Sequence, residues 1–389
     1  MSSEVDTDRL AHELRALGDS NLIRPRRTVT PVSATEYLVD GHRCISFAAN
    51  DYLGLSQHPQ VLKAFREAAS LQAGATASAL VAGRTVWHEQ LERRIARFEG
   101  TESAVLFPSG YAANVGTLAA MVGPDDCVFC DRDNHASIVD GCRLAAGKMF
   151  VYRHNELSRL AAALHRRRSQ FDRAFIVTDS VFSMDGVIAP LKELSRVAEQ
   201  FAVDLIVDEA HATGVFGPTG RGVCEALSVT ENVLIRVGTL SKAVGTLGGF
   251  VAASQSVCDW LWNTARTQFF STALPPAVCA AASESLRQIR RDLDRAARLN
   301  RICRYARQLL NEVGLETIAG SVGPIVPILI GDDAQAVSLS ERLLRDGYFV
   351  PAIRPPTVRK GTARLRLSLC SEHTPEQVES VIQHISKIL

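Results

Sequence analysis

Short apolar runs alternate with longer stretches of helical periodicity between residues 103 and 254. A fully apolar run of strand length is typical of a strand buried on both faces, and alternation of such runs with helices is typical of a parallel sheet. We therefore predict an α/β region built on a mainly parallel sheet with helices on both faces. The predicted strands are 104–107, 128–130, 150–152, 174–178, 203–207, 234–237 and 250–253.

The residues before this region carry a different pattern. Leu10, Leu14 and Leu17 recur at helical spacing, which predicts a short amphipathic helix over 5–17 that packs on another subunit or domain. Two alternating runs surround Asp40-Gly41 and predict a β-hairpin over 36–47. Helices are predicted over 59–69 and 88–99, the first opened by a proline.

The C-terminal part changes pattern again. Residues 285–313 form a long helical stretch rich in Arg and Leu, followed by predicted strands at 325–330 and 363–369 with helices between and after them. Neither an internal repeat nor a low-complexity linker separates these parts. We expect tightly packed domains: an N-terminal helix and hairpin segment (1–49), a large domain (50–284) and a small C-terminal domain (285–389).

The amino-acid composition limits the kinds of molecule that the protein is expected to bind. The chain has 389 residues with 43 basic and 42 acidic side chains, so no global field favours nucleic acid or an anionic membrane. No stretch reaches the roughly 20 apolar residues of a membrane span. The N-terminus is polar and has no apolar signal region, so we expect a cytoplasmic protein that acts on small molecules.

Cysteine usage agrees with a reducing compartment. The nine cysteines are odd in number and mostly lie in apolar runs, which predicts buried, reduced thiols. Cys127 and Cys130 form the single C-x-x-C pair, and it lies in a predicted strand without a second pair. We therefore expect no metal site.

Lys242 is the strongest candidate for covalent chemistry. It follows the apolar run 233–237 and lies among glycines and small residues, with the hydroxyls of Thr239 and Ser241 nearby. An amine held close to backbone can shift its pKa, form an imine and act as a base. Neighbouring hydroxyls suit a phosphate held beside an aldehyde, and pyridoxal 5'-phosphate (PLP) has both groups. The alternative is an exposed lysine in a flexible loop.

Asp208 and His211 follow another predicted strand. A buried carboxylate at a strand end needs a cationic or donor partner, and a protonated pyridine nitrogen is such a partner. His211 could reach the phenolic oxygen of the same ring. Alternatively, Asp208 caps the next helix and His211 is polar surface.

Other polar groups follow the remaining strands. Ser109-Gly110-Tyr111 opens a predicted helix, whose N-terminal N–H groups could bind a phosphate or could simply form a strand-to-helix turn. His135 could stack on a flat ring, and Ser183 offers a hydroxyl. Because open α/β sheets bind ligands beyond the carboxyl ends of their strands, these groups should converge.

With these residues in this order along the sequence, the chain resembles the alpha-oxoamine synthases. The resemblance runs from about Asn50 to the C-terminus and is carried by residues 47–55, 181–186, 208–214 and 353–358, the last of which is most similar to the biotin-pathway members. It implies a fold-type I PLP-dependent transferase with a smaller α+β C-terminal domain. It also implies a decarboxylating condensation of L-alanine with pimeloyl-CoA or a pimeloyl carrier protein.

The resemblance assigns roles by position. It implies that Lys242 holds the cofactor and that Asp208 and His135 are also catalytic. It implies that Arg366 grips the amino-acid carboxylate with help from Asn50. The cofactor contacts it implies are Gly110, Tyr111, His135, Ser183, Asp208, His211, Thr239 and Lys242, with Ser271 and Thr272 lent to the other subunit of a homodimer; the implied substrate contacts are Arg24, Asn50, His135, Arg354, Thr357 and Arg366.

One segment departs from the family. Family members usually show a glycine-rich run such as G-S-G-G-S, whereas two glycines have become alanine in residues 74–84 of this chain. If those positions need a positive φ, the loop must run differently here, which bears on the acyl pocket more than on the cofactor site.

Three other functions stay open at this point. The first is a relative with other substrates, such as glycine with acetyl-CoA, and the second is an aminotransferase on the same fold. The third is a non-catalytic partner subunit, which the joint presence of Lys242, Asp208 and His135 argues against.

Overall fold

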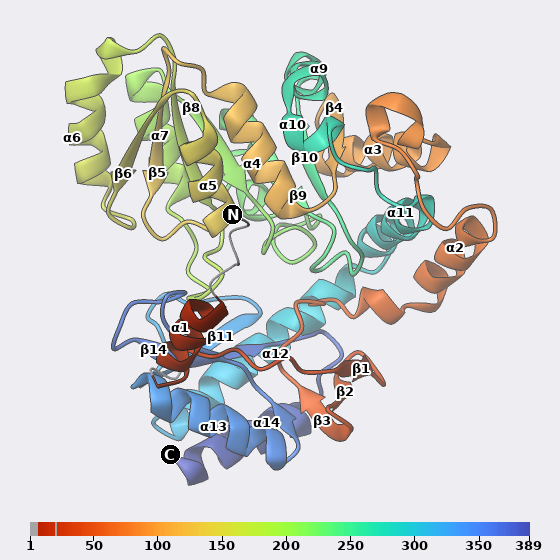
Figure 1. Ribbon diagram of the computed structural model, residues 1–389, viewed down its shortest axis with the longest axis vertical. Helices are drawn as coiled ribbons and strands as arrows, with labels where there is room; N and C mark the ends of the chain where they lie inside the picture. The colour runs from red at the N-terminus through yellow and green to blue at the C-terminus, as the bar shows by residue number, and fades with distance from the viewer. Residues whose placement is uncertain (1–6, 20–21) are drawn as a thin grey trace.

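The predicted sheet forms the centre of one half of the molecule (Figure 1). In the computed structural model, which describes residues 7–19 and 22–389, seven strands pair in the order β4-β10-β9-β8-β7-β5-β6. All neighbours are parallel except β10, which is antiparallel to both β4 and β9. The mainly parallel α/β sheet is confirmed. The strands are β4 (Ser103–Phe107), β5 (Cys127–Asp131), β6 (Lys148–Tyr152), β7 (Ala174–Asp179), β8 (Asp204–Asp208), β9 (Ile235–Thr239) and β10 (Gly249–Ala253).

Helices cover both faces of this sheet. Successive strand residues point to opposite faces, so Val128 and Cys130 enter one apolar cluster while Cys127 and Phe129 enter the other. All nine cysteines are buried and free, as predicted. The helices of this half are α3 (Val86–Glu99), α4 (Gly110–Met121), α5 (Ala136–Leu144), α6 (Leu157–Arg167), α7 (Leu191–Phe201), α8 (Val223–Ala226), α9 (Gln255–Thr264) and α10 (Arg266–Phe269).

The predicted helical stretch 285–313 is confirmed as helical, but it is not continuous. Two helices occupy this region, α11 (Pro276–Arg291) and α12 (Leu293–Glu312). Asp292 between them has a non-helical backbone, and its side chain accepts a hydrogen bond from the backbone N–H of Arg295 at 3.2 Å. An aspartate in this position caps the start of a new helix, which explains the break.

A second, antiparallel sheet lies below the first in Figure 1. It has the order β11-β14-β13. The predicted strands at 325–330 and 363–369 are therefore confirmed. The elements here are β11 (Ile325–Gly331), β13 (Ala352–Ile353), β14 (Ala363–Ser368), α13 (Asp333–Arg345) and α14 (Pro375–Ile388).

The N-terminal hairpin joins this lower half. Strands β2 (Glu36–Val39) and β3 (His42–Ser46) pair as predicted, and the turn residues Asp40 and Gly41 both have positive φ. The same sheet includes β1 (Val29–Pro31) and β12 (Tyr348–Phe349), and β12 runs parallel to β3. The domain boundaries at 49 and 284 stay a prediction.

The other predicted helices are present. Helix α2 covers Pro59–Ala69, and α1 covers Thr7–Asp19, with residues 5 and 6 of that prediction outside the described residues. Leu10, Leu14 and Leu17 are exposed in the single chain, so their packing on another subunit stays a prediction. No helix within 7–19 and 22–389 is long and apolar enough to cross a membrane. Short helical turns are η1 (Leu55–Gln57), η2 (Ala79–Gly83), η3 (Arg168–Gln170) and η4 (Thr230–Asn232).

Candidate active site

Polar side chains from several loops meet at the carboxyl edge of the seven-stranded sheet. The pairing of β7 with β8 places Asp179 beside Asp208. The backbone N–H of His135, beyond β5, donates to Asp179 Oδ2 at 2.7 Å. Lys242, beyond β9, is close enough to both aspartates for their charges to act on its pKa. The convergence predicted from the strand ends is therefore present.

Lys242 has an amine that is easier to deprotonate than usual. Burial lowers its pKa from 10.5 to about 8; Asp208 and Asp179 oppose that shift, and Arg366 adds to it. The loop that carries Lys242 packs closely on the backbone of Leu55 and Ser56. Gly245 has a φ of 72°, and a Cβ there would lie 2.5 Å from the backbone nitrogen of Ser56, so only glycine fits. The lysine thus sits on a fixed turn rather than in an open loop.

Asp208 is buried and accepts hydrogen bonds from neutral donors. Asn114 Nδ2 donates to Oδ2 at 2.6 Å, and the backbone N–H of Ala210 donates to Oδ1 at 2.7 Å. Both donors are amides, so hydrogen bonding leaves the negative charge of Asp208 uncompensated. A cationic ligand atom would supply that compensation.

His211 is held neutral beside Tyr52. Its Nδ1 lies 2.7 Å from the Tyr52 hydroxyl. Burial lowers the pKa of His211 well below 6.5, and the charges of Lys242 and Arg366 act in the same direction. The neutral ring can donate one hydrogen bond and accept another without carrying a charge.

His135 caps helix α5 and stays exposed. Its Nδ1 lies 2.7 Å from the Ser137 hydroxyl, and its backbone N–H is held by Asp179. Partial desolvation lowers the pKa of His135, opposed by the charge of Asp208. A neutral, open imidazole face is suited to stacking on a flat ring.

The start of helix α4 lies against Thr239. A Cβ on Gly110 would meet Thr239 Oγ1 at 3.1 Å, and Thr239 Oγ1 lies 2.8 Å from Ser241 Oγ. Ser109 caps the helix by accepting from the N–H of Ala112 at 3.1 Å. Helix N–H groups and two hydroxyls therefore gather at one place, which suits a phosphate. Tyr111 is exposed, and its hydroxyl donates to Asp140 Oδ2 at 2.5 Å.

Arg366 on β14 reaches this cluster from the second sheet. Its Nε donates to the carbonyl oxygen of Ser183 at 2.8 Å, and its guanidinium donates to Asn50 Oδ1 at 3.3 Å. Arg364, two residues away on the same strand, pairs with Asp185. Within 7–19 and 22–389, no carboxylate pairs with Arg366, so this buried cation is available to a ligand carboxylate.

Arg354, Arg24 and Thr357 form a separate group. Arg354 is buried, and its Nη2 donates to the carbonyl oxygen of Ile23 at 2.8 Å. This contact brings the exposed Arg24 to the loop that carries the exposed Thr357. The backbone N–H of Thr357 in turn donates to the carbonyl oxygen of Arg354 at 3.1 Å.

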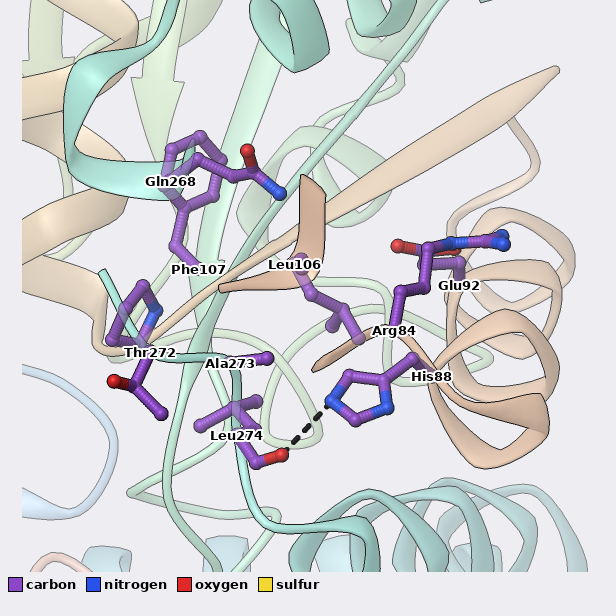
Figure 2. A pocket seen from close by; sticks show the side chains of 11 residues that line it. Arg84, His88, Glu92, Leu106, Phe107, Gln268, Thr272, Ala273 and Leu274 are labelled. Atoms are coloured by element: carbon purple, nitrogen blue, oxygen red, sulfur yellow. Dashed lines mark hydrogen bonds and ion pairs between the residues drawn. The ribbon is translucent and has the colours of Figure 1, made fainter. Parts of the chain in front are cut away.

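Ser271 and Thr272 are not joined to the Lys242 cluster by any hydrogen bond in the described part of the chain. Thr272 is exposed and forms a β-bridge with Ser78. Thr272 also lines a pocket in which His88 Nε2 lies 2.9 Å from the carbonyl oxygen of Leu274 (Figure 2). This pocket is distinct from the Lys242 cluster, because no residue of that cluster lines it.

The loop that departs from the family keeps a left-handed residue. Thr76 has a φ of 58°, a value that normally favours glycine. The loop is tied to the chain beside Thr272, since the carbonyl oxygen of Ala77 accepts from the N–H of Ala273 at 3.0 Å. A glycine-like conformation is thus adopted here without glycine.

Sequence reasoning missed three residues of the cluster. Tyr52, Asn114 and Asp179 hold His211, Asp208 and His135, respectively. The signal for Asp179 was available, because it ends an apolar strand as Asp208 does. Asn114 lies one helical turn after Gly110, on the same face of α4, but only its hydrogen bond to Asp208 in the folded chain reveals its partner.

Comparison with known proteins places the chain in a family. The family described as aminotransferase class I and II matches residues 42–385. The 8-amino-7-oxononanoate synthase of Geobacter sulfurreducens is 43% identical over 386 residues, 98% of both chains.

Two solved structures are also similar. A serine palmitoyltransferase of S. paucimobilis, solved with bound PLP and myriocin, has a TM-score of 0.93 and 33% identity, covering 100% of this chain and 98% of its own. The 8-amino-7-oxononanoate synthase of Francisella tularensis has a TM-score of 0.76 and 31% identity, covering 89% of this chain and 97% of its own.

Proposed function

The chain belongs to the aminotransferase class I and II family, and from its similarity to 8-amino-7-oxononanoate synthases we propose that it is one of these enzymes. Such an enzyme is a PLP-dependent acyltransferase of biotin biosynthesis. It condenses L-alanine with a pimeloyl thioester and releases carbon dioxide and a free thiol. The observation that carries the proposal is the cluster that Lys242 and Arg366 form with the paired strand-end carboxylates of Asp179 and Asp208.

The residues of the cluster fit PLP. Lys242 offers the amine that would hold the cofactor's aldehyde carbon, and Asp208 offers the uncompensated carboxylate that a protonated ring nitrogen needs. The phosphate would lie at the start of α4 with Thr239. Ser183 and Tyr111 border the same site, His211 would contact the ring oxygen, and His135 would stack on the ring.

When bound, PLP supplies an electron sink for the negative charge that forms at the amino-acid Cα. Lys242 Nζ would remove the Cα proton and return it, because a pKa of about 8 leaves a substantial minority of the amine neutral near physiological pH, whereas an ordinary lysine is almost wholly protonated there. Arg366 binds and orients the amino-acid carboxylate, and Asn50 fixes the guanidinium. The negative charge of Asp208 would favour the protonated form of the ring nitrogen.

The acyl chain would lie along the Arg354 group. A pimeloyl chain ends in a carboxylate, and Arg354 is a buried cation whose hydrogen bond in the described chain goes to the neutral carbonyl of Ile23. Arg24 and Thr357 lie on the adjoining segments. A donor without a terminal carboxylate would leave this cation without its ionic partner.

The proposal includes a homodimer with shared sites. Ser271 and Thr272 are not bonded to the Lys242 cluster of their own chain, and Thr272 is exposed beside the bridge to Ser78. These residues would serve the phosphate site of the partner.

A substrate matrix tests the assignment. Alanine, glycine and serine are each combined with pimeloyl-, acetyl- and palmitoyl-CoA, and thiol release and product mass are measured. We expect alanine with pimeloyl-CoA to give the highest kcat/KM. Serine with palmitoyl-CoA is the pairing to exclude, because the serine palmitoyltransferase superposes with a TM-score of 0.93. A preference for that pairing, or for glycine with acetyl-CoA, would overturn the assignment.

A further inference from the structure

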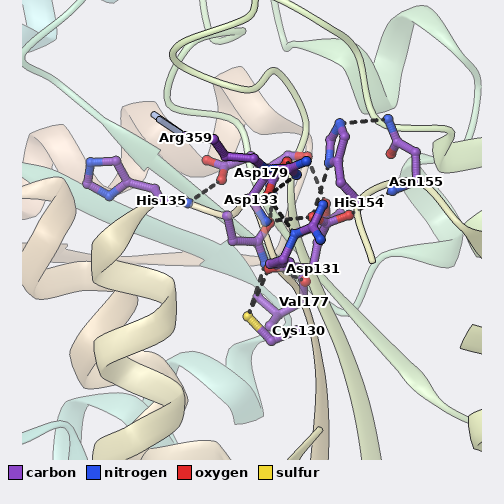
Figure 3. A network of polar contacts seen from close by, with 12 residues as sticks. Cys130, Asp131, Asp133, His135, His154, Asn155, Val177, Asp179 and Arg359 are labelled. Atoms are coloured by element: carbon purple, nitrogen blue, oxygen red, sulfur yellow. Dashed lines mark hydrogen bonds and ion pairs between the residues drawn. The ribbon is translucent and has the colours of Figure 1, made fainter. Parts of the chain in front are cut away.

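Asp133 and Arg359 join the two halves of the molecule beside the candidate site (Figure 3). Arg359 Nη2 lies 2.9 Å from Oδ2 and 3.2 Å from Oδ1 of Asp133. Asp133 precedes His135 by two residues, and Arg359 follows Thr357 by two residues. The ion pair therefore connects the segment of a candidate catalytic residue to the loop of a candidate substrate residue.

Asp133 belongs to a rigid turn. Its backbone N–H donates to Oδ1 of the buried Asp131 at 2.9 Å, and the same carboxylate contacts His154 Nδ1 at 3.1 Å. Asn134 Nδ2 donates to the carbonyl oxygen of Val177 on β7 at 2.9 Å. Figure 3 shows these contacts around the ends of the strands. Asp133 is thus a fixed anchor point.

The loop that carries Arg359 has little other attachment to this anchor. Apart from the bond of Arg354 to the carbonyl oxygen of Ile23, its remaining hydrogen bonds run within the loop, as from Thr357 to Arg354 and from the Thr362 hydroxyl to the carbonyl oxygen of Arg359 at 2.8 Å. Within the described chain, the contact of Arg359 with Asp133 is the side-chain bond that ties residues 355–361 to the seven-stranded half.

We propose that this ion pair is a clasp that holds the loop of Arg354 and Thr357 opposite His135. Arg359 and Asp133 are positioning residues, and the clasp favours binding of the acyl substrate rather than the chemical step. The substrate part of this inference rests on the proposed function; the clasp itself does not.

The expected effect is modest. Arg359 is 61% exposed at its side chain and Asp133 is 28% exposed, so solvent screens the pair. Exposed ion pairs change an equilibrium by about two- to fivefold. Arg132 Nε also lies 3.1 Å from Asp133 Oδ1, so removing Asp133 frees two cations and removing Arg359 leaves one pair in place.

Limited proteolysis tests the clasp without any substrate. Trypsin cleaves after Arg359 and Lys360, and Asp133→Asn leaves both cleavage sites intact while removing the charge of the anchor. We expect cleavage in this loop to become about two- to fivefold faster. The matched control is Asp125→Asn, an exposed acid of the same half, which should leave the rate unchanged. Cleavage of Asp133→Asn at the parent's rate would overturn the clasp.

Steady-state kinetics test whether the clasp contributes to binding of the acyl substrate. Arg359→Gln, Asp133→Asn and the double variant should raise the KM for pimeloyl-CoA by about two- to fivefold, with kcat within twofold of the parent. The double variant should be no worse than the worse single variant, because both remove one interaction. Lys360→Gln, with the same charge change in the same loop, should behave as the parent.

These experiments distinguish a failure of the clasp inference from a failure of the proposed function. Faster proteolysis with an unchanged KM would overturn the role in substrate binding while the clasp stands. A parent enzyme that does not turn over pimeloyl-CoA refutes the proposed function, and proteolysis then decides the clasp alone.

Discussion

Two buried polar regions of this molecule differ in how completely their groups are paired. Both ring nitrogens of His373 have a partner: Nδ1 accepts from the N–H of Cys370 at 2.9 Å, and Nε2 donates to the carbonyl oxygen of Ser46 at 3.0 Å. The ring stacks on Phe47 with a centroid distance of 4.6 Å. This histidine links the N-terminal segment to the end of β14.

The carboxyl edge of the seven-stranded sheet is paired incompletely. Within 7–19 and 22–389, Lys242 Nζ makes no hydrogen bond, Asp208 meets only neutral donors and Arg366 has no carboxylate partner. Buried polar groups cost free energy unless they are paired. A fully paired group therefore indicates a structural role, and incompletely paired groups mark the place where a ligand completes the set.

The largest expected effect is on Lys242. Lys242→Ala removes the amine and should lower turnover by at least about a thousandfold. The melting temperature should stay within about 4 °C of the parent, because no hydrogen bond of the fold is lost. Thiol release and thermal unfolding followed by circular dichroism check the two parts, and turnover near the parent's would refute the role of Lys242.

Asp208 should have the next largest effect. Asp208→Asn keeps the shape but removes the charge, and exchange of the alanine α-proton should slow by about 10²- to 10³-fold. Exchange is followed by NMR in deuterated water. Asp204→Asn, at the exposed start of the same strand, is the matched control. An unchanged exchange rate in Asp208→Asn would rule out its proposed role at the ring nitrogen.

His373 tests the fully paired region. His373→Ala leaves two backbone groups without partners and removes a stacked ring, so the free energy of unfolding should fall by about 2–4 kcal/mol. The kcat should change little. Chemical denaturation measures the loss, with the half-exposed His384→Ala as the control. A large loss of kcat in a folded His373→Ala would break the contrast between the regions.

The same histidine makes stability depend on pH. Burial lowers the pKa of His373 from 6.5 to about 4, so between these values the unfolded state binds a proton that the folded state does not. The contribution of neutral His373 to the free energy of unfolding is complete above pH 6.5. About 3 kcal/mol of it is lost as the pH falls to 4. The difference between the parent and His373→Ala should therefore shrink on acidification.

Lys242 should show its lowered pKa when the apoprotein is loaded with PLP. Only the neutral amine reacts, so the loading rate should rise about tenfold per pH unit below pH 8 and level off above it. The visible absorbance of the lysine-bound cofactor follows the reaction. A rise that continues toward pH 10.5 would show an ordinary, unperturbed lysine.

Thr76 gives the smallest effect. Its φ of 58° strains a β-branched residue, and Thr76→Gly should raise the free energy of unfolding by about 0.5 kcal/mol after the entropy of glycine is subtracted. Ala77→Gly, at the next position and without a positive φ, should instead lower it by about 0.4–1 kcal/mol. Equal effects of both substitutions would show that the strain at Thr76 is absent.

The sequence alone determined the sheet, most helices and the residues that end its strands. Apolar runs of strand length and capping residues are local signals, so they located the loops that carry Lys242, Asp208 and His135 and made these residues candidates. The break at Asp292 was missed because its capping role competes with a continuous helical pattern.

Only the tertiary structure decided which of these groups are paired. Tyr52 with His211, Asn114 with Asp208, and Arg359 with Asp133 are separated by 159, 94 and 226 residues. No local pattern encodes such contacts, because they arise from the packing of whole elements. The pKa of Lys242 depends on the same packing, since burial and the distances to Asp208, Asp179 and Arg366 exist only in the folded chain.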